Sequence, residues 1–271
     1  MSDPRLDRRG VVSPSEVRRP RQVFSLEGRV ALVSGGGTGI GWGVTQCLWA
    51  AGARVALTGR RESVLRTAVE SLGERASWFI HDVTDFEASA GLVERIRSEL
   101  GPIDILVNNA GIHLKKPALE TTESELQQVV DVHLTGAFSL TRACLPGMIE
   151  LGEGSVVFIA SMASFLGLPL VLAYSTAKTG VLGMVRSLAA EYSRRGVRFN
   201  AVAPGWIHSR MLDQSMEGDP GREEKVLART MLGRFGNPED VGWAVVYLCS
   251  PAAHYITGAC LPVDGGASVG F

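Results

Sequence analysis

Short apolar runs alternate along the chain with longer segments in which apolar residues recur at helical spacing. The apolar runs predict strands at residues 30–34, 54–58, 76–81, 103–108, 155–160, 197–202 and 259–263. The helical spacing predicts helices at residues 39–51, 62–72, 85–100, 123–149, 173–194 and 238–248. Strands that alternate with helices of this length pair in parallel through right-handed crossovers. The pattern therefore predicts an α/β fold: one doubly wound domain with a mostly parallel sheet of about seven strands and helices on both faces.

Three segments fall outside this alternation. Residues 1–23 carry six arginines and three prolines, and predict a flexible extension, with a functional arm as the alternative. Residues 206–231 follow the end of a strand, where ligands bind in such sheets, and are interpreted as a mobile substrate lid or a plain surface insertion. Residues 154–177 carry no charge and are long enough to span a bilayer, but Pro169 and the serines favour a buried strand followed by a site loop. Residues 24–271 are therefore expected to form one dinucleotide-binding and catalytic domain.

The charge and the cysteines of the 271-residue chain exclude several classes of protein. There are 27 basic and 28 acidic residues, so no overall field favours nucleic acid or a membrane as a partner. Residues 1–23 lack the apolar core of a secretory signal. The four cysteines stand among apolar neighbours and predict buried free thiols in a reducing, cytoplasmic compartment: Cys47, Cys144, Cys249 and Cys260. No histidine or cysteine spacing is typical of a metal site.

A glycine-rich turn follows the first predicted strand. It reads Ser34-Gly-Gly-Gly-Thr-Gly-Ile-Gly41 and leads directly into a predicted helix. Glycine allows a tight turn and lets backbone N–H groups approach a pyrophosphate at the helix N-terminus, although a strict G-x-G-x-x-G is absent. The turn predicts a Rossmann-type nucleotide site whose residues are Gly35, Thr38, Gly39, Ile40 and Gly41.

The end of the second predicted strand bears on the choice of cofactor. Many NAD sites place an acidic residue there to bind the ribose 2′-hydroxyl, whereas this chain has Arg60 and Arg61. A guanidinium group pairs well with phosphate. We therefore expect NADP(H) to be preferred, with NAD(H) as the alternative. If the two arginines do not bind the cofactor, they are solvated residues at the start of a helix.

Candidate chemistry follows the fifth predicted strand. Tyr174 and Lys178 are four residues apart and share a helix face, about 6 Å apart along the axis. A nearby cation favours tyrosinate, so the pair predicts a general acid/base with a lowered pKa. Ser161 is placed to hydrogen-bond the same substrate oxygen.

These motifs together resemble the short-chain dehydrogenase/reductase family over nearly all of residues 26–269. The resemblance rests on the glycine-rich turn, Asn108-Asn-Ala-Gly111, Ser161 thirteen residues before Tyr174, Tyr174-Ser-Thr-Ala-Lys178, and Pro204-Gly205. The chain is most similar to the 3-oxoacyl-carrier-protein-reductase-like members.

The resemblance implies a role for each matching residue. Tyr174 would be the acid/base, Lys178 would bind the nicotinamide ribose and depress the tyrosine pKa, and Ser161 would orient the carbonyl. The remaining cofactor contacts that it implies are Asp82 and Val83 at the adenine, Asn109 against the cofactor, the Ile207 backbone at the carboxamide, and Ser209 in place of a common threonine. For Asp82 a turn residue is the alternative, and for Asn108 a structural role is favoured.

One position departs from the family. Where the family has a catalytic asparagine that holds a water in a proton relay, this chain has His133. Histidine can donate or accept, so His133 either continues the relay, with a group titrating near pH 6–7, or satisfies backbone groups of its helix.

The expected function is an NADP(H)-dependent oxidoreductase that moves a hydride between nicotinamide and a small-molecule ketone or secondary alcohol. The alternatives are a catalytically silent dinucleotide-binding regulatory protein and a non-redox isomerase or dehydratase. By resemblance, a homo-oligomer (tetramer or dimer) is expected. Lys115 and Lys116 either attract an anionic group or are solvated. An apolar substrate pocket is predicted from Leu114, Phe165, Leu166, Leu168, Trp206, Met211 and Leu212.

Overall fold

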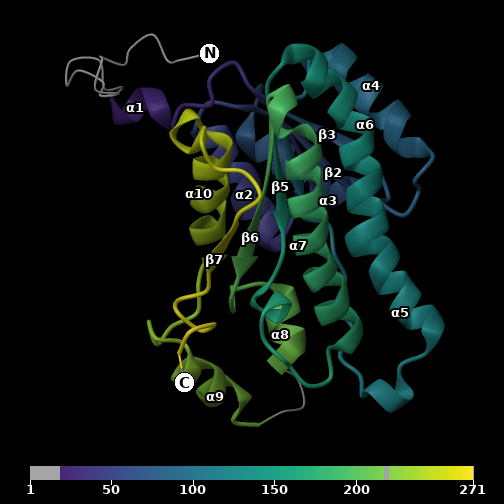
Figure 1. Cartoon of the computed structure of the whole chain (residues 1–271), viewed down its shortest axis with the longest axis vertical. Coiled ribbons are helices and arrows are strands. Elements are labelled where there is room, and N and C mark those ends of the chain that lie inside the picture. Colours follow the sequence, from purple (N-terminus) through teal and green to yellow (C-terminus); the bar gives the residue numbers. More distant parts are fainter. Residues whose placement is uncertain (1–18, 217–219, 271) are drawn as a thin grey trace.

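The centre of the protein is a seven-stranded sheet, seen in a computed structural model that describes residues 19–216 and 220–270 (Figure 1). The spatial order is β3-β2-β1-β4-β5-β6-β7, and every strand pair is parallel. The strands are β1 (Val30–Ser34), β2 (Arg54–Gly59), β3 (Ala76–Ile80), β4 (Ile105–Asn108), β5 (Gly154–Ile159), β6 (Val197–Pro204) and β7 (Cys260–Val263). The strand order reverses between β1 and β4, which opens a crevice at the carboxyl ends of these strands.

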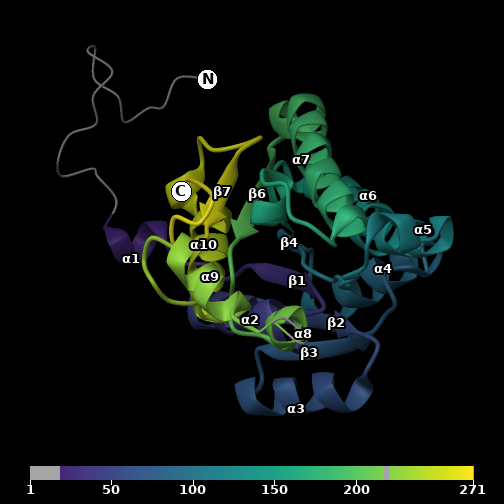
Figure 2. The ribbon, with the colours of Figure 1, turned by 90° about the horizontal axis from the view of Figure 1, so that it is seen from below.

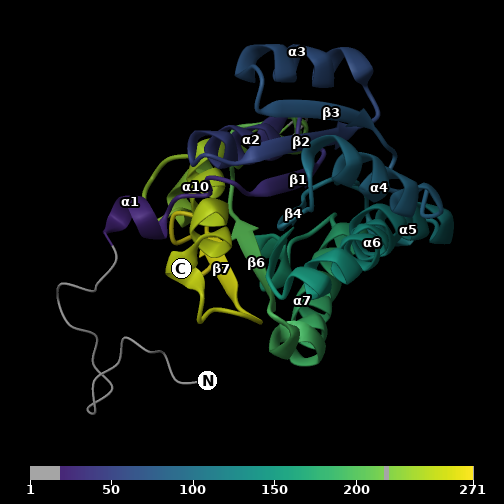
Figure 3. The ribbon, with the colours of Figure 1, turned by 90° about the horizontal axis from the view of Figure 1, so that it is seen from above.

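Helices cover both faces of the sheet (Figure 3). One face carries α2 (Gly39–Ala50), α3 (Glu62–Leu72) and α10 (Pro238–Cys249). The other face carries α4 (Ala88–Leu100), α6 (Gly136–Leu151) and α7 (Leu172–Tyr192). The remaining helices lie outside the two layers: α1 (Pro20–Val23), α5 (Glu123–Val130), α8 (Arg210–Met216) and α9 (Arg222–Arg229). Figure 2 shows α8 and α9 lying across the edge at which the strands end.

Burial on both faces explains why the central strands are apolar throughout. Along β4, Leu106 packs into the core beneath α4, α6 and α7, whereas Ile105 and Val107 pack into the core beneath α2 and α10. The same alternation places Leu32 of β1 in the first core and Val33 in the second. A strand with two buried faces has no position that favours a polar residue, so its sequence becomes a continuous apolar run.

The predicted elements are found with shifts of one or two residues at several ends, and with three larger differences. The sheet is wholly rather than mostly parallel. The predicted helix at 85–100 begins at Ala88, because Asp85 forms a turn in which its carboxylate accepts the Ala88 N–H at 3.2 Å. The predicted helix at 123–149 is interrupted by a π-helical turn, Asp131–Thr135, between α5 and α6.

Two of the segments outside the alternation, residues 1–23 and 154–177, form short helices, a strand and a loop in their described parts. Of the predicted N-terminal extension, residues 1–18 lie outside the described residues, while α1 forms within it and Phe24 packs 6.3 Å from Tyr247 between ring centroids. The uncharged segment at 154–177 is β5, a loop and the start of α7. Among the described residues, none of the helices combines the length and the apolar character needed to cross a membrane.

Candidate active site

The glycine-rich turn joins β1 to α2 at the crevice. Gly35 and Gly39 have φ values of +64° and +52°, the left-handed region that favours glycine. At Gly41 a Cβ would lie 2.1 Å from the Gly35 carbonyl oxygen, so no side chain fits there. Thr38 is the N-cap residue of α2 but its side chain makes no capping hydrogen bond. The first residues of α2 line the crevice, and among the described residues no side chain caps their N–H groups, which suits a pyrophosphate.

Asn109 braces this turn from the neighbouring strand. Its side-chain amide donates to the carbonyl oxygens of Ser34 at 3.0 Å and Gly35 at 3.2 Å. The Ser34 hydroxyl accepts the N–H groups of Asn109 and Ala110 at 3.0 and 3.1 Å. Asn108 donates to the Thr141 hydroxyl at 3.0 Å, in line with its expected structural role. The two carboxyl ends that form the crevice are thus fastened together by side chains.

One end of the crevice is a cavity of about 770 Å³ that contains Arg60, Arg61, Asp82 and Val83, four of the residues predicted to bind the cofactor. Asp82 accepts the Thr84 N–H at 3.0 Å and the Thr84 hydroxyl at 2.8 Å, the turn geometry that was the alternative for this residue. Arg60 is 70% exposed, and its guanidinium lies 3.7 Å from the Asp82 carboxylate. Partial burial acts to raise the pKa of Asp82, but the Thr84 hydrogen bonds and the Arg60 charge leave that pKa below its usual value. Arg60 is thus held beside Asp82 by a weak surface pair.

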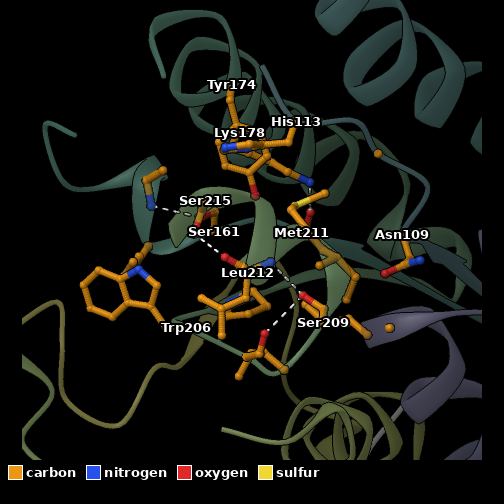
Figure 4. A pocket seen from close by; sticks show the side chains of 18 of the residues that line it. Asn109, His113, Ser161, Tyr174, Lys178, Trp206, Ser209, Met211, Leu212 and Ser215 are labelled. Carbon is orange, nitrogen blue, oxygen red and sulfur yellow. Dashed lines mark hydrogen bonds between the residues drawn. The ribbon is translucent and has the colours of Figure 1, made fainter. Parts of the chain in front are cut away.

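Three of the four predicted catalytic residues, Ser161, Tyr174 and Lys178, converge at the other end of the crevice (Figure 4). Ser161 follows β5, and its hydroxyl accepts the Ala163 N–H at 3.1 Å. Tyr174 and Lys178 lie one turn apart on α7, with the Lys178 Nζ 5.7 Å from the Tyr174 ring centroid. The Lys178 ammonium donates to the Ile159 carbonyl at 2.5 Å. Figure 4 shows the Tyr174 hydroxyl directed toward Ser161, so both can reach one substrate oxygen.

Burial dominates the electrostatics of this group. It lowers the pKa of Lys178 to about 7. It raises the pKa of Tyr174, while the interaction with the Ser161 hydroxyl acts in the opposite direction. The expectation of a lowered tyrosine pKa therefore does not hold for the protein alone, because burial of the phenol outweighs the effects that favour tyrosinate. At neutral pH the phenol of Tyr174 is protonated.

His133 lies in the π-helical turn and is buried. Its Nε2 lies 2.8 Å from the carbonyl oxygen and 3.2 Å from the amide nitrogen of Ile112, in the loop after β4 rather than in its own helix. Burial, followed by the Lys178 charge, lowers the pKa of His133 to about 3. The expected titration near pH 6–7 is therefore wrong: His133 is neutral throughout the physiological range. Its ring stands edge-on to Tyr174, with 5.4 Å between centroids.

The segment predicted as a lid contributes α8 to the wall of this cavity, whose volume is about 320 Å³. The Ser209 hydroxyl donates to the Ile207 carbonyl at 3.1 Å and accepts the Leu212 N–H at 3.2 Å, so it stabilises the start of α8. The Lys115 ammonium donates to the Ser215 carbonyl at 3.0 Å and links the loop after β4 to α8.

Among the residues predicted to form the apolar pocket, the cavity wall contains Leu168, Trp206, Met211 and Leu212, but not Leu114, Phe165 or Leu166. Phe165 is half exposed at the surface. Lys116 pairs with both carboxylate oxygens of Glu125 at 2.9 Å. The interpretation of Lys116 as an anion-binding residue is therefore less favoured than a structural ion pair.

All the residues predicted to act in catalysis or in cofactor binding line one of the two cavities. A further residue, His113, was not predicted. Its ring stands edge-on to Tyr174 at 5.7 Å between centroids, and both of its ring nitrogens are buried without a hydrogen-bond partner among the described residues. No sequence signal could have found it, because an isolated histidine after Asn108-Asn-Ala-Gly111 has no spacing typical of a site.

Comparisons with known proteins agree with this geometry. The family model described as enoyl-(acyl carrier protein) reductase matches residues 35–268. The chain is 39% identical to a galactitol 2-dehydrogenase (L-tagatose-forming) of Cereibacter sphaeroides over 252 residues, 92% of this chain and 98% of that protein. It is 36% identical to a 3-oxoacyl-[acyl-carrier-protein] reductase of Vibrio cholerae over 243 residues, 90% of this chain and 98% of that protein. A gluconate 5-dehydrogenase of Burkholderia cenocepacia, solved in complex with NADP and tartrate, superposes with a TM-score of 0.88 at 29% identity, covering 93% of this chain and 100% of that one.

Proposed function

The chain belongs to the short-chain dehydrogenase/reductase family, with a sequence like those of its 3-oxoacyl-[acyl-carrier-protein] reductases, and from this premise we propose which residues carry its chemistry. It is an oxidoreductase that transfers a hydride between a nicotinamide cofactor and an alcohol or ketone group. We propose that Tyr174 is its general acid/base, assisted by Ser161 and Lys178. The observation that carries this proposal is the convergence of these three side chains, from two separate elements, at one end of the nucleotide crevice.

The crevice fits a dinucleotide. The turn around Gly41 has no room for a side chain, and the uncapped N–H groups of α2 face it. These groups would hold the pyrophosphate, Asp82 and Val83 would flank the adenine, and the Ile207 backbone would hold the carboxamide. The nicotinamide, when bound, supplies or accepts the hydride. Asn109 supports the cofactor site indirectly, by holding the glycine-rich turn, because its side-chain amide already donates to the carbonyl oxygens of Ser34 and Gly35.

The chain's own residues transfer the proton to and from the substrate oxygen. The Ser161 hydroxyl donates a hydrogen bond to the substrate carbonyl oxygen and orients it. The Tyr174 hydroxyl, protonated at neutral pH because burial raises its pKa, gives its proton to that oxygen during reduction and takes one back during oxidation. Lys178, hydrogen-bonded to the Ile159 carbonyl beside the phenol, stabilises negative charge on the tyrosine oxygen when the proton has left. Reduction at neutral pH is therefore the direction for which the resting protonation state is suited.

A preference for NADP(H) over NAD(H) is part of the proposal. Arg60 stands at the adenine end with only a weak pair to Asp82, and Arg61 adjoins it in the same cavity. A 2′-phosphate is a stronger partner for guanidinium than an exposed carboxylate 3.7 Å away.

The substrate is proposed to be a small-molecule carbonyl compound or alcohol, enclosed by α8 and α9 as a lid. The relatives divide into two classes: galactitol is a polyol whose reacting carbon has hydroxylated neighbours, whereas a 3-oxoacyl chain has methylene groups beside its reacting carbonyl. A homo-oligomer, dimer or tetramer, is proposed from the family resemblance, and a reducing, cytoplasmic compartment is proposed from the free cysteines.

The test is Tyr174→Phe, which removes the hydroxyl and keeps the ring. NADPH consumption with a panel of ketones should fall by at least about a hundredfold, while NADPH binding measured by fluorescence stays unchanged. Tyr255→Phe is the matched control, because Tyr255 is 96% exposed, and it should behave as wild type. Full activity of Tyr174→Phe would overturn the assignment of the acid/base.

A further inference from the structure

We propose that His113 is a specificity-determining residue that hydrogen-bonds an oxygen substituent on the carbon next to the reacting carbonyl. The proposal rests on the function proposed above and deepens it by naming the substrate class. Substrates would be hydroxyketones and the corresponding vicinal diols, as opposed to carbonyl compounds flanked by methylene groups.

The position of His113 places it beside the reaction. Its ring and that of Tyr174 meet edge to face, 5.7 Å between centroids and 72° apart, and both line the same cavity (Figure 4). His133 meets Tyr174 at 88°. The phenol that reaches the substrate oxygen thus has His113 as a neighbour on the wall of the same cavity.

The position of His113 is set by its neighbours in the loop. Ile112, the residue before it, is held by the His133 ring at 2.8 Å from its carbonyl oxygen. Two residues further along, Lys115 donates to the Ser215 carbonyl of α8 at 3.0 Å. Gly111 permits this arrangement, because a Cβ there would lie 2.5 Å from the Cε1 of His133. A short loop tied at both ends holds its side chain in place, and pre-organised groups of this kind discriminate between substrates.

The hydrogen-bonding state of His113 points to the ligand. Both ring nitrogens are buried and have no partner among the described residues. Burial, with the charges of Lys115 and Arg222, lowers the pKa of His113, so the imidazole is neutral. A neutral imidazole has one donor and one acceptor. A hydroxyl group can be a partner to either nitrogen, whereas an alkyl group would cover both without satisfying them.

This difference decides between the two substrate classes. A site that hydrogen-bonds a substrate hydroxyl rejects the analogue without it, because the buried polar groups of the site are left unpaired. A 3-oxoacyl chain would bring methylene groups to His113, and a polyol would bring hydroxyl groups. One neutral hydrogen bond corresponds to about tenfold in kcat/KM.

The experiment compares paired substrates that differ by one hydroxyl: 3-hydroxybutan-2-one with butan-2-one, and 2-hydroxycyclohexanone with cyclohexanone. NADPH consumption is measured for wild type, His113→Phe, which keeps a ring against Tyr174, and His113→Gln, which keeps a donor and an acceptor. Wild type should prefer the hydroxylated member of each pair by about tenfold. His113→Phe should bring the ratio near one mainly by losing the hydroxylated substrate, and His113→Gln should retain part of the preference.

Several results would contradict the proposal. A wild-type ratio near one excludes it, and so does a His113→Phe variant in which both members of a pair fall equally, which would show a structural role. His254→Phe, at an exposed position, is the control and should keep the wild-type ratio. Circular dichroism and NADPH binding establish that each variant is folded. A wild-type protein that binds NADPH but consumes neither NADPH nor NADH with any carbonyl compound would instead overturn the proposed function itself.

Discussion

Replacing Lys178 by methionine should make the cofactor-free protein more stable while abolishing its activity. The Lys178 side chain is 5% exposed, and burial lowers its pKa from 10.5 to about 7. In the unfolded chain the amine keeps its ordinary affinity for the proton. Folding at neutral pH therefore requires either removal of that proton or burial of the charge, and methionine, of similar length, avoids both costs.

The magnitude follows from the two pKa values. The shift from 10.5 to about 7, at about 1.4 kcal/mol per pKa unit, corresponds to about 4 kcal/mol at pH 7, where the folded lysine is half protonated. Methionine loses the hydrogen bond to the Ile159 carbonyl, which offsets about 1 kcal/mol. The net gain in the free energy of unfolding is about 3 kcal/mol at pH 7.

The sign of the pH dependence is specific to this cause. Between the folded and unfolded pKa values the unfolded chain binds more protons, so wild-type stability rises with pH over that window. The advantage of Lys178→Met should therefore shrink by about 2 kcal/mol between about pH 7 and pH 9.

The assay is urea unfolding of wild type and variant at both pH values and at one protein concentration. Lys225→Met, which replaces an exposed lysine on α9, is the matched control and should show neither the gain nor its pH dependence. Equal stabilities, or an advantage for Lys178→Met that is constant with pH, would refute the reasoning that burial of the amine sets its pKa.

Two further predictions concern the cofactor and the relay. Arg60→Ala should lower kcat/KM for NADPH by about tenfold and leave that for NADH nearly unchanged, because a partly exposed guanidinium contributes a discounted phosphate contact. Steady-state kinetics with both cofactors test this, with Arg66→Ala on α3 as the control, and a parallel fall for both cofactors would argue against a phosphate contact. His133→Asn should leave the shape of the pH–rate profile unchanged between about pH 5 and 9, because burial holds the His133 pKa at about 3. A limb of the wild-type profile that disappears in this variant would show that His133 titrates after all.

The strands and the motif residues were predictable because each leaves a local signal. A strand buried on two faces, such as β1, becomes a continuous apolar run. The π-helical turn Asp131–Thr135 was not predictable, since its apolar positions continue the spacing of the helices on either side. The pKa directions of Tyr174 and Lys178 were also beyond the sequence, because they depend on how deeply the folded chain encloses α7. His113 was missed because its place is set by a contact between Ile112 and His133, 21 residues apart.

The turn around Gly41 has a consequence for interpreting distant homologues. The Gly35 carbonyl and the Asn109 amide lie so close that a methyl group at residue 41 would overlap both, at 2.1 and 2.4 Å, whether or not a nucleotide is present. Evolution would therefore keep this glycine in a descendant that had lost its cofactor, for as long as the architecture itself survived. A glycine at this position therefore indicates a shared fold and not a retained activity. Loss of activity would first change residues that the fold does not require.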